Sequence, residues 1–339
     1  SDYAMYSVKH TDKGRLGDFD IEDYRKNEFI MSGQEEFFHI VESRKVRYAF
    51  QMIVDARTGE TYGYEALMRP QGETIKSPVQ ILEIAKKCAT ATLFISSANS
   101  LSTAPIVISG TPEQKEKYLP GVAAGESLIA FGLTEPNAGS DAASMTTRAV
   151  EDGDSYILNG RKCFITMAPI ADQCIVYAKT DPEKGAKGIT CFMVDMNLPG
   201  VSCGRHEEKM GQRGVPVSDV VLEDVRVPKD CIIGEVGMGF INAMKTLSVG
   251  RVGVSSMCLG MAQEAIDLAV NHTKNRVQFG KPLAKMQALQ FMMADMETKL
   301  NAARLLTYNA AYLLDTRQPA DKAASMAKYY SAEAAIEIV

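Results

Sequence analysis

The spacing of hydrophobic and polar residues changes twice along the chain. In residues 1–87 charged and apolar positions are mixed, and the clearest feature is a pair of β-prone runs, Tyr48–Val54 and Thr61–Leu67, separated by the turn-forming sequence DARTG. Apolar residues then recur at helical spacing through residues 76–103. The N-terminal part is therefore expected to contain one hairpin followed by helix.

Residues 127–235 have the pattern of a β domain. In DSYILNGRKCFIT, Asn159-Gly160 stands between two β-prone runs, which is a strong signal for a two-residue hairpin. The segments GITCFMVDM and SDVVLEDVRVP follow as further strands, broken by NLPG and VPK. We expect this domain to be antiparallel.

From Gly237 onward the period becomes helical. One helix is predicted over 237–275, a second over Pro282–Asp315, and a third opens at Pro319 and Asp321. The third reaches Val339 with no Gly, Pro or basic last turn, which is typical of a helix that continues. The predicted fold class is α+β, with a helical segment, a middle antiparallel β domain and a C-terminal helical bundle.

Composition narrows the functional classes. The formal net charge is −5, so no basic field attracts nucleic acid, and no run approaches the roughly 20 apolar residues that span a bilayer. The start lacks the apolar core of a signal peptide. The 7 cysteines form no C-x-x-C pair and the 4 histidines stand alone, which predicts neither a disulfide framework nor a metal site. A soluble, cytoplasmic protein is expected.

The stretch AFGLTEPNAGSDAASMTT carries the clearest candidate chemistry. Gly139 permits close backbone approach, while Thr134 and Ser140 offer hydroxyls, so the loop can bind a phosphate or a heteroaromatic edge through its main-chain N–H groups. On spacing alone, a tight β-turn is the favoured alternative.

The same loop resembles the signature loop of the acyl-CoA dehydrogenase family. Five further segments resemble that family in the same order: GTPEQKEKYLPGVAAGE, NGRKCFIT, KMGQRGVPVSDVVLEDVRVP, GEVGMGF and NRVQFGKPLAKMQALQ. The resemblance covers about residues 88–339 and implies a partial N-terminal helical domain (88–127), a middle β domain (128–236) and an incomplete C-terminal helical domain (237–339). It implies an FAD-dependent α,β-dehydrogenase of acyl-CoA thioesters, a homotetramer, and an electron-transferring flavoprotein as acceptor.

The resemblance also implies site residues, although each one alone is more often a core or surface residue. Phe131, Leu133 and Thr134 match the strand that meets the flavin ring, Gly139 and Ser140 the signature loop, and Phe164 and Thr166 the aromatic and hydroxyl beside the ring. Ser140 is shared with the substrate, and Ser248 and Arg251 match substrate-side positions. The matches that reach FAD across a subunit interface are Arg276, Gln278, Phe279 and Gln287.

No catalytic residue of this chain is implied. The base glutamate of the family is expected beyond Val339, and its alternative position before the arginine is Gly250 here. Ser248 also stands where many members carry aspartate, which leaves the acyl preference open.

The first 87 residues resemble something else. DYAMYSVKHTDKGR is similar to the end of a GGDEF domain and YAFQMIVDARTGETYGYEALMRP to the start of an EAL domain, in which Glu65 matches a metal ligand. One carboxylate cannot hold a hard divalent pair, so no metal site is predicted. This pattern favours a chimera joined near residue 87. The alternatives are an unusual native N-terminus, a cyclic di-GMP signalling protein of the GGDEF–EAL type, and a non-catalytic acyl-CoA-binding protein.

Overall fold

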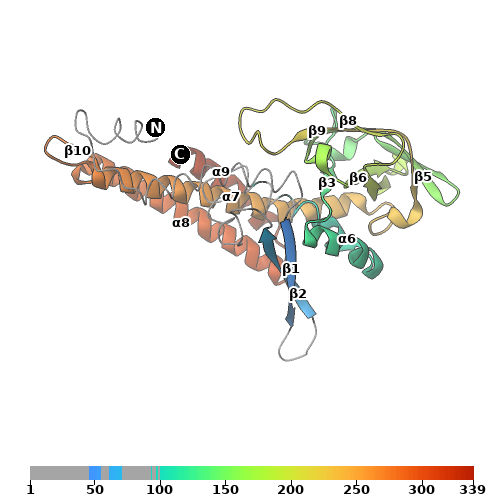
Figure 1. Ribbon diagram of the computed structural model, residues 1–339, viewed down its shortest axis with the longest axis horizontal. Coiled ribbons are helices and arrows are strands. Elements are labelled where there is room, and N and C mark those ends of the chain that lie inside the picture. Colours follow the sequence, from blue (N-terminus) through green and yellow to red (C-terminus); the bar gives the residue numbers. More distant parts are fainter. Residues whose placement is uncertain (1–45, 55–60, 71–92, 94–96, 98–99) are drawn as a thin grey trace.

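The computed structural model describes residues 46–54, 61–70, 93, 97 and 100–339. A β domain lies at one end of the molecule and three long helices extend away from it, with a short helical segment packed at their junction (Figure 1). The predicted order of helical segment, β domain and helical bundle is confirmed from residue 104 onward. Most of the helix predicted over 76–103 lies outside the described residues.

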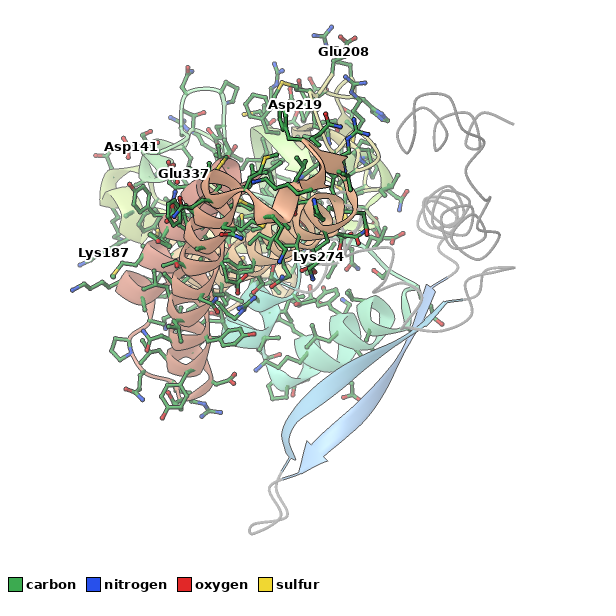
Figure 2. All side chains as sticks on the ribbon, turned by 90° about the vertical axis from the view of Figure 1, so that its left-hand side faces the viewer. Asp141, Lys187, Glu208, Asp219, Lys274 and Glu337 are labelled. Carbon is green, nitrogen blue, oxygen red and sulfur yellow. The ribbon has the colours of Figure 1, made fainter. Side chains whose placement is uncertain are left out.

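The N-terminal hairpin forms where the sequence predicted it. β1 (Val46–Val54) pairs with β2 (Thr61–Pro70) in an antiparallel two-stranded sheet. The hairpin contacts α6 and projects away from the β domain and the long C-terminal helices (Figure 2). Glu65 lies on β2, opposite Gln51 in the register, and its side chain lies outside the described residues.

In residues 100–128, which the structure describes, two helices precede the β domain: α5 (Ala104–Ser109) and α6 (Pro112–Ala124). α6 begins with a capping box in which Thr111 and Gln114 bond reciprocally, and it ends at Gly125, whose φ of 72° is the left-handed conformation that glycine adopts without penalty. The amide of Gln114 also donates to the carbonyl oxygens of Asp230 (2.8 Å) and Ile232 (2.7 Å). This one side chain therefore fixes both the start of the helix and its position on the β domain.

The β domain is a seven-stranded sheet in the order β3-β6-β4-β5-β9-β8, with β7 also paired to β6. Pairs β4–β5, β5–β9, β6–β7 and β8–β9 are antiparallel as predicted, whereas β3–β6 and β4–β6 are parallel. The strands are β3 (Ile129–Gly132), β4 (Arg148–Asp152), β5 (Ser155–Thr166), β6 (Gln173–Lys179), β7 (Ile189–Asp195), β8 (Val201–Cys203) and β9 (Val217–Pro228).

The sheet is buried on both faces, and β6 shows this best. Ile175 and Tyr177 enter the core shared with α5, α6 and the start of α7, whereas Cys174 and Val176 enter the core inside the β domain. This alternation is the two-residue period of a strand. Because both faces are covered, the middle of the strand reads as a continuous apolar run.

The prediction of a hairpin at Asn159-Gly160 is wrong. β5 runs straight through these residues, and the chain reverses earlier, at Gly153 (φ 60°), between paired Asp152 and Ser155. Gly160 is instead the site of a register shift against β9, and a Cβ there would lie 2.3 Å from the hydroxyl of Thr147. The glycine serves a close approach of two chain segments rather than a turn.

After the β domain the chain forms three long helices: α7 (Gly239–Asn275), α8 (Gln287–Asp315) and α9 (Asp321–Ile338). A small hairpin of β10 (Val277–Gln278) and β11 (Lys281–Pro282) joins α7 to α8. Their shared core includes Cys258, Ala262, Ile266, Leu300, Ala335 and Ile338. Within the described ranges, no helix combines the length and the apolar character needed to cross a membrane.

One buried amide connects three parts of the fold. Asn242, on α7, accepts a hydrogen bond from the hydroxyl of Tyr177 on β6 (2.7 Å). Its amide donates to the carbonyl oxygen of Pro105 (3.0 Å) and to the hydroxyl of Ser109 (2.8 Å), both on α5. The helical segment, the β domain and the bundle therefore meet at a single side chain, called the junction amide below.

Candidate functional site

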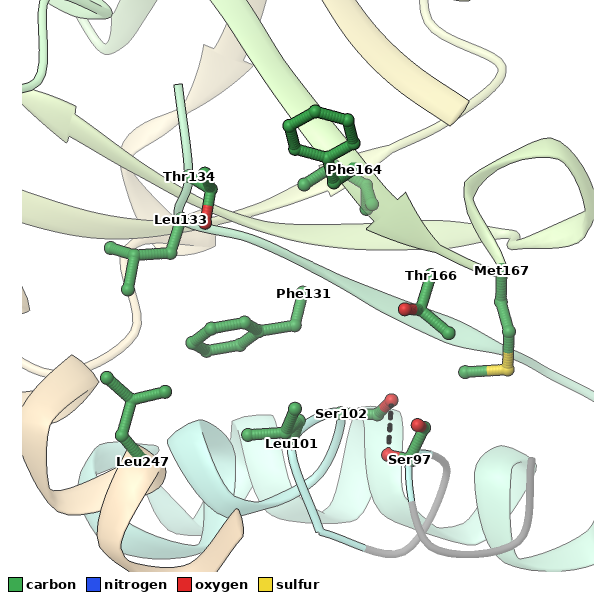
Figure 3. A pocket seen from close by; sticks show the side chains of 11 residues that line it. Ser97, Leu101, Ser102, Phe131, Leu133, Thr134, Phe164, Thr166, Met167 and Leu247 are labelled. Carbon is green, nitrogen blue, oxygen red and sulfur yellow. Dashed lines mark hydrogen bonds between the residues drawn. The ribbon is translucent and has the colours of Figure 1, made fainter. Parts of the chain in front are cut away.

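A pocket of about 210 Å³ lies where the β domain faces the helical segment and α7 (Figure 3). Apolar side chains make most of its walls, and the hydroxyls of Thr134 and Thr166 stand at its β-domain side. The lining residues are Ser97, Leu101, Ser102, Phe131, Leu133, Thr134, Phe164, Ile165, Thr166, Met167 and Leu247.

Phe164 owes its position to a β-bulge. The register between β5 and β9 shifts between Lys162 and Ile165, and Phe164 has a φ of 58°. A bulge re-aims a side chain, and a non-glycine residue in this left-handed region costs on the order of 1–3 kcal/mol. The result is a large apolar ring that is 65% exposed beside the pocket. Such cost and exposure together indicate a surface prepared for an apolar ligand.

Phe131 is held from behind by an aromatic contact. Its ring meets that of Tyr177 edge-to-face, with centroids 5.5 Å apart and an interplanar angle of 66°. Tyr177 is fully buried and bonded to the junction amide, and burial raises the pKa of its hydroxyl well above the usual value. It therefore remains a neutral, fixed support for the pocket wall.

A buried ion pair contacts the backbone of the same wall, because the Lys162 ammonium donates to the carbonyl oxygen of Leu133 (3.2 Å). The ammonium of Lys162 is 2.7 Å from the carboxylate of Glu135, with side chains 0% and 2% exposed. Burial alone would raise the pKa of Glu135, but the Lys162 charge and the hydrogen bonds from Thr147 and Thr146 lower it to about 2. Burial lowers the pKa of Lys162, and the Glu135 charge opposes that lowering. The sequence did not indicate a role for Glu135 or Lys162, because charged residues mostly lie at the surface and nothing in the local pattern shows that these two are buried.

The structure brings together some of the predicted site residues and separates others. Phe131, Leu133, Thr134, Phe164 and Thr166 all line the one pocket. The predicted loop residues Gly139 and Ser140 are exposed and do not line it. Sequence reasoning missed the wall made by Leu101, Leu247 and Met167, which carry no polar signal.

The predicted interface residues lie at the far end of the helical bundle. Gln278 and Phe279 belong to the hairpin between α7 and α8, which stands opposite the β domain (Figure 1). α7 has 37 residues, a length of roughly 55 Å at 1.5 Å per residue, so the hairpin cannot reach the pocket of its own chain. Phe279 is 93% exposed at a φ of 54°, while Arg276 is half-buried and Gln287 is exposed.

The predicted substrate residues Ser248 and Arg251 lie on α7, one turn apart. The hydroxyl of Ser248 donates to the carboxylate of Asp321 at the start of α9 (2.6 Å), and a guanidinium nitrogen of Arg251 is 3.5 Å from the same hydroxyl. Asp321 was predicted only as a helix opener. It supplies a carboxylate beside Ser248, the position where many family members carry aspartate.

Models of all three domains of one protein family match the chain. They are the N-terminal domain of acyl-CoA dehydrogenase at residues 70–126, the middle domain at 130–225 and the C-terminal domain at 237–339. The 3-(aryl)acrylate reductase of Clostridium sporogenes is 58% identical over 257 residues, which are 76% of this chain and 68% of that protein. The chain belongs to the acyl-CoA dehydrogenase family.

Two further relatives of this acyl-CoA dehydrogenase family member are informative. Subunit CarC of the caffeyl-CoA reductase–Etf complex of Acetobacterium woodii is 52% identical over 79% of this chain and 70% of its own length. The butyryl-CoA dehydrogenase structure from Megasphaera elsdenii superimposes with a TM-score of 0.75 at 36% identity and covers 95% of this chain and 87% of that one.

These findings correct the expectation for the first 87 residues. Nothing in the comparisons shows a GGDEF or EAL domain, and the match to the N-terminal acyl-CoA dehydrogenase domain begins at residue 70 rather than at 88. The cyclic di-GMP alternative therefore has no support. The short β motif that carried it forms an isolated two-stranded hairpin in this structure.

Acyl-CoA dehydrogenases are FAD-dependent oxidoreductases, and the pocket fits a flavin ring. Its apolar walls suit a flat heteroaromatic system, the exposed Phe164 ring offers a further apolar face, and Thr134 and Thr166 offer hydroxyls for polar ring atoms. A volume of about 210 Å³ is smaller than the roughly 300–1,000 Å³ typical of drug-sized ligands. The pocket therefore fits the ring but not the whole dinucleotide.

Proposed function

We propose that this chain catalyses oxidoreduction at the Cα–Cβ bond of an acyl-CoA thioester. The observation that carries the proposal is that two chain segments 30 residues apart, one with Phe131 and Thr134 and the other with Phe164 and Thr166, line one apolar pocket in a member of this family. Bound FAD supplies the hydride chemistry, and the protein supplies orientation and exclusion of water.

The roles of the pocket residues follow from their placement. Phe131 and Leu133 form the apolar wall and keep water from the reacting bond, and Phe164 covers the open side. Thr134 and Thr166 orient the cofactor ring through their hydroxyls. In the described part of the chain no carboxylate lines the pocket, so the removal of the α-proton is assigned to no residue there.

On the substrate side, we propose that Arg251 binds the acyl-CoA and that Ser248 orients its guanidinium. Asp321 keeps the Ser248 hydroxyl in place, with a carboxylate that comes from α9 rather than from α7. Ser140 and Gly139 lie on an exposed loop, where they are open to a ligand that extends beyond the pocket.

We further propose that the chain works as a homo-oligomer. The hairpin between α7 and α8 presents Phe279, exposed and in a strained backbone conformation, far from the pocket of its own chain. Arg276, Gln278, Phe279 and Gln287 would then contact FAD bound by a second copy. Replacing Arg276 or Gln287 should weaken FAD binding only in the oligomer, and a strictly monomeric chain with normal FAD affinity would refute this role.

The names of the relatives favour a second candidate, reduction of a 3-arylacrylyl thioester. Both relatives described above with more than half identity carry reductase names, and one is named as part of an Etf complex. An electron-transferring flavoprotein is accordingly the proposed redox partner in either direction.

The first experiment is the visible spectrum of the purified chain with added FAD, followed by anaerobic addition of butyryl-CoA. Retained flavin that bleaches on addition supports acyl-CoA oxidation. Flavin that is first reduced chemically and then reoxidised by a 3-arylacrylyl-CoA, but not by crotonyl-CoA, supports the aryl reductase. A chain that binds no flavin refutes both.

A further inference from the structure

The buried ion pair of Glu135 and Lys162 connects the two chain segments that carry the predicted flavin contacts. Glu135 directly follows Thr134 at the end of β3, and Lys162 lies on β5, two residues before Phe164. Thr134 and Phe164 both line the pocket, whereas the two charged side chains do not line it and are fully buried in protein.

The Lys162 ammonium and the neighbouring backbone N–H both bind the chain where it leaves β3. The Lys162 ammonium also donates to the carbonyl oxygen of Leu133 (3.2 Å), and the N–H of Cys163 donates to the carbonyl oxygen of Thr134 (2.9 Å). The end of β3 is thus attached to β5 at two successive carbonyl groups.

The Glu135 carboxylate also binds a third segment, the end of the loop between β3 and β4. It accepts the N–H of Thr146 (2.6 Å), the hydroxyl of Thr146 (2.8 Å) and the N–H of Thr147 (3.0 Å). Thr147 in turn lies against Gly160 of β5. The loop between β3 and β4 therefore closes back onto the strand that carries the bulge.

Stability alone does not account for this arrangement. A buried ion pair is often no more stabilising than apolar residues of the same volume, because removing two charges from water offsets their attraction. The site also demands space, since a Cβ on Gly132 would lie 3.4 Å from Cγ of Lys162 and 3.1 Å from the sulfur of Cys174. What an apolar pair would lack is the directional attachment of the β3 end to β5.

We propose that Glu135 and Lys162 are positioning residues for the flavin site. They fix the residues that follow β3 against the bulge of β5. The two segments are thereby held in one relative position, in which Thr134 on the first and Phe164 and Thr166 on the second can contact the same flavin ring. Neither charge touches the pocket, so the pair acts through the backbone. This inference rests on the FAD site of the proposed function.

The test compares FAD affinity and the flavin spectrum among four proteins: the unmodified chain, E135Q, the double variant E135Q/K162M and D152N. D152N is the matched control, because it neutralises a carboxylate of the Arg226–Asp152 ion pair, which also joins two strands but is more than half exposed. The double variant removes the unpaired ammonium that E135Q leaves buried. Far-UV circular dichroism establishes that each protein is folded.

We expect E135Q and the double variant to bind FAD at least tenfold more weakly and to lose the resolved shoulders of the bound flavin spectrum, with D152N unchanged. An E135Q protein with unmodified affinity and spectrum would overturn the inference, whatever its unfolding midpoint. So would a double variant that regains unmodified affinity, because the defect would then come from an unpaired charge. A failure of the unmodified chain to bind FAD would overturn the proposed function and this inference with it.

Discussion

Replacing Tyr177 with Phe would remove one hydroxyl and keep the buried ring. The acceptor oxygen of the junction amide, Asn242, would then have no donor, and a buried unsatisfied group costs about 1–3 kcal/mol. Replacing Asn242 with Ala would leave the buried Tyr177 hydroxyl without this partner, at a cost of roughly 1–3 kcal/mol, whereas the carbonyl oxygen of Pro105 keeps its helical hydrogen bond within α5. The double variant removes both partners of the Tyr177–Asn242 hydrogen bond, so neither of these two groups is left buried and unpaired.

The double variant should therefore cost less than the sum of the two single variants, by at least about 2 kcal/mol. The measurement is urea unfolding followed by far-UV circular dichroism, at one pH and one FAD concentration. Midpoints convert to free energies for variants that share the same m value. Y177F should leave FAD affinity unchanged, since the ring that supports Phe131 is kept. A coupling energy below about 0.5 kcal/mol would refute the reasoning, because the two side chains would then be independent.

The remaining predictions concern separate parts of the molecule. The pKa of Glu135 falls from 4.5 to about 2, so about 3 kcal/mol of stability present above pH 4.5 should be lost as the pH falls toward 2, and E135Q should flatten this acid limb of the urea midpoint. T166V should change the rate of flavin reduction in stopped-flow experiments more than the melting temperature, because Thr166 presents its hydroxyl to the pocket; an unchanged rate would remove it from the site. F279A should weaken self-association in light scattering without lowering the stability of the monomer, since the ring is 93% exposed. G239A should destabilise by about 1–3 kcal/mol or more in urea unfolding, because its Cβ would lie 2.6 Å from the backbone of β7, whereas G260A on the same helix meets nothing within 4 Å and should be neutral or stabilising.

Local patterns in the sequence were enough to predict the N-terminal hairpin, the strands β7 and β9 and the three long helices, but not the strands β3, β4, β6 and β8. β7 is an apolar run between turn residues, the second half of β9 alternates apolar and polar residues, and α8 repeats apolar residues every three or four positions. The form of each element is therefore decided by burial of one face or both. The Asn159-Gly160 prediction failed because the reason for the glycine is a contact with Thr147, 13 residues away in the chain. Glycine is the residue that favours a tight turn and also the residue that lets two chain segments approach closely, so its presence alone does not tell the two apart.

The candidate site was predictable only where a motif named its residues. Phe131 and Thr166 could be placed by resemblance, but the Glu135–Lys162 contact joins residues 27 apart and the Ser248–Asp321 contact joins residues 73 apart. Nothing in local hydrophobic spacing indicates which charge becomes buried or which residues meet. These contacts depend on how the strands and helices pack, which is decided by the whole fold.

The junction amide also has a consequence for synthesis of the protein. Asn242 is made 137 residues after Pro105 and 133 residues after Ser109, the groups on α5 that it satisfies. At about 5–20 residues per second, α5 waits roughly 7–27 s on the ribosome before its partner has been made. During that interval the apolar side of α5, including the later fully buried Ile106, has no α7 to cover it. The nascent chain is thus most in need of a chaperone after the β domain has emerged and before α7 has followed.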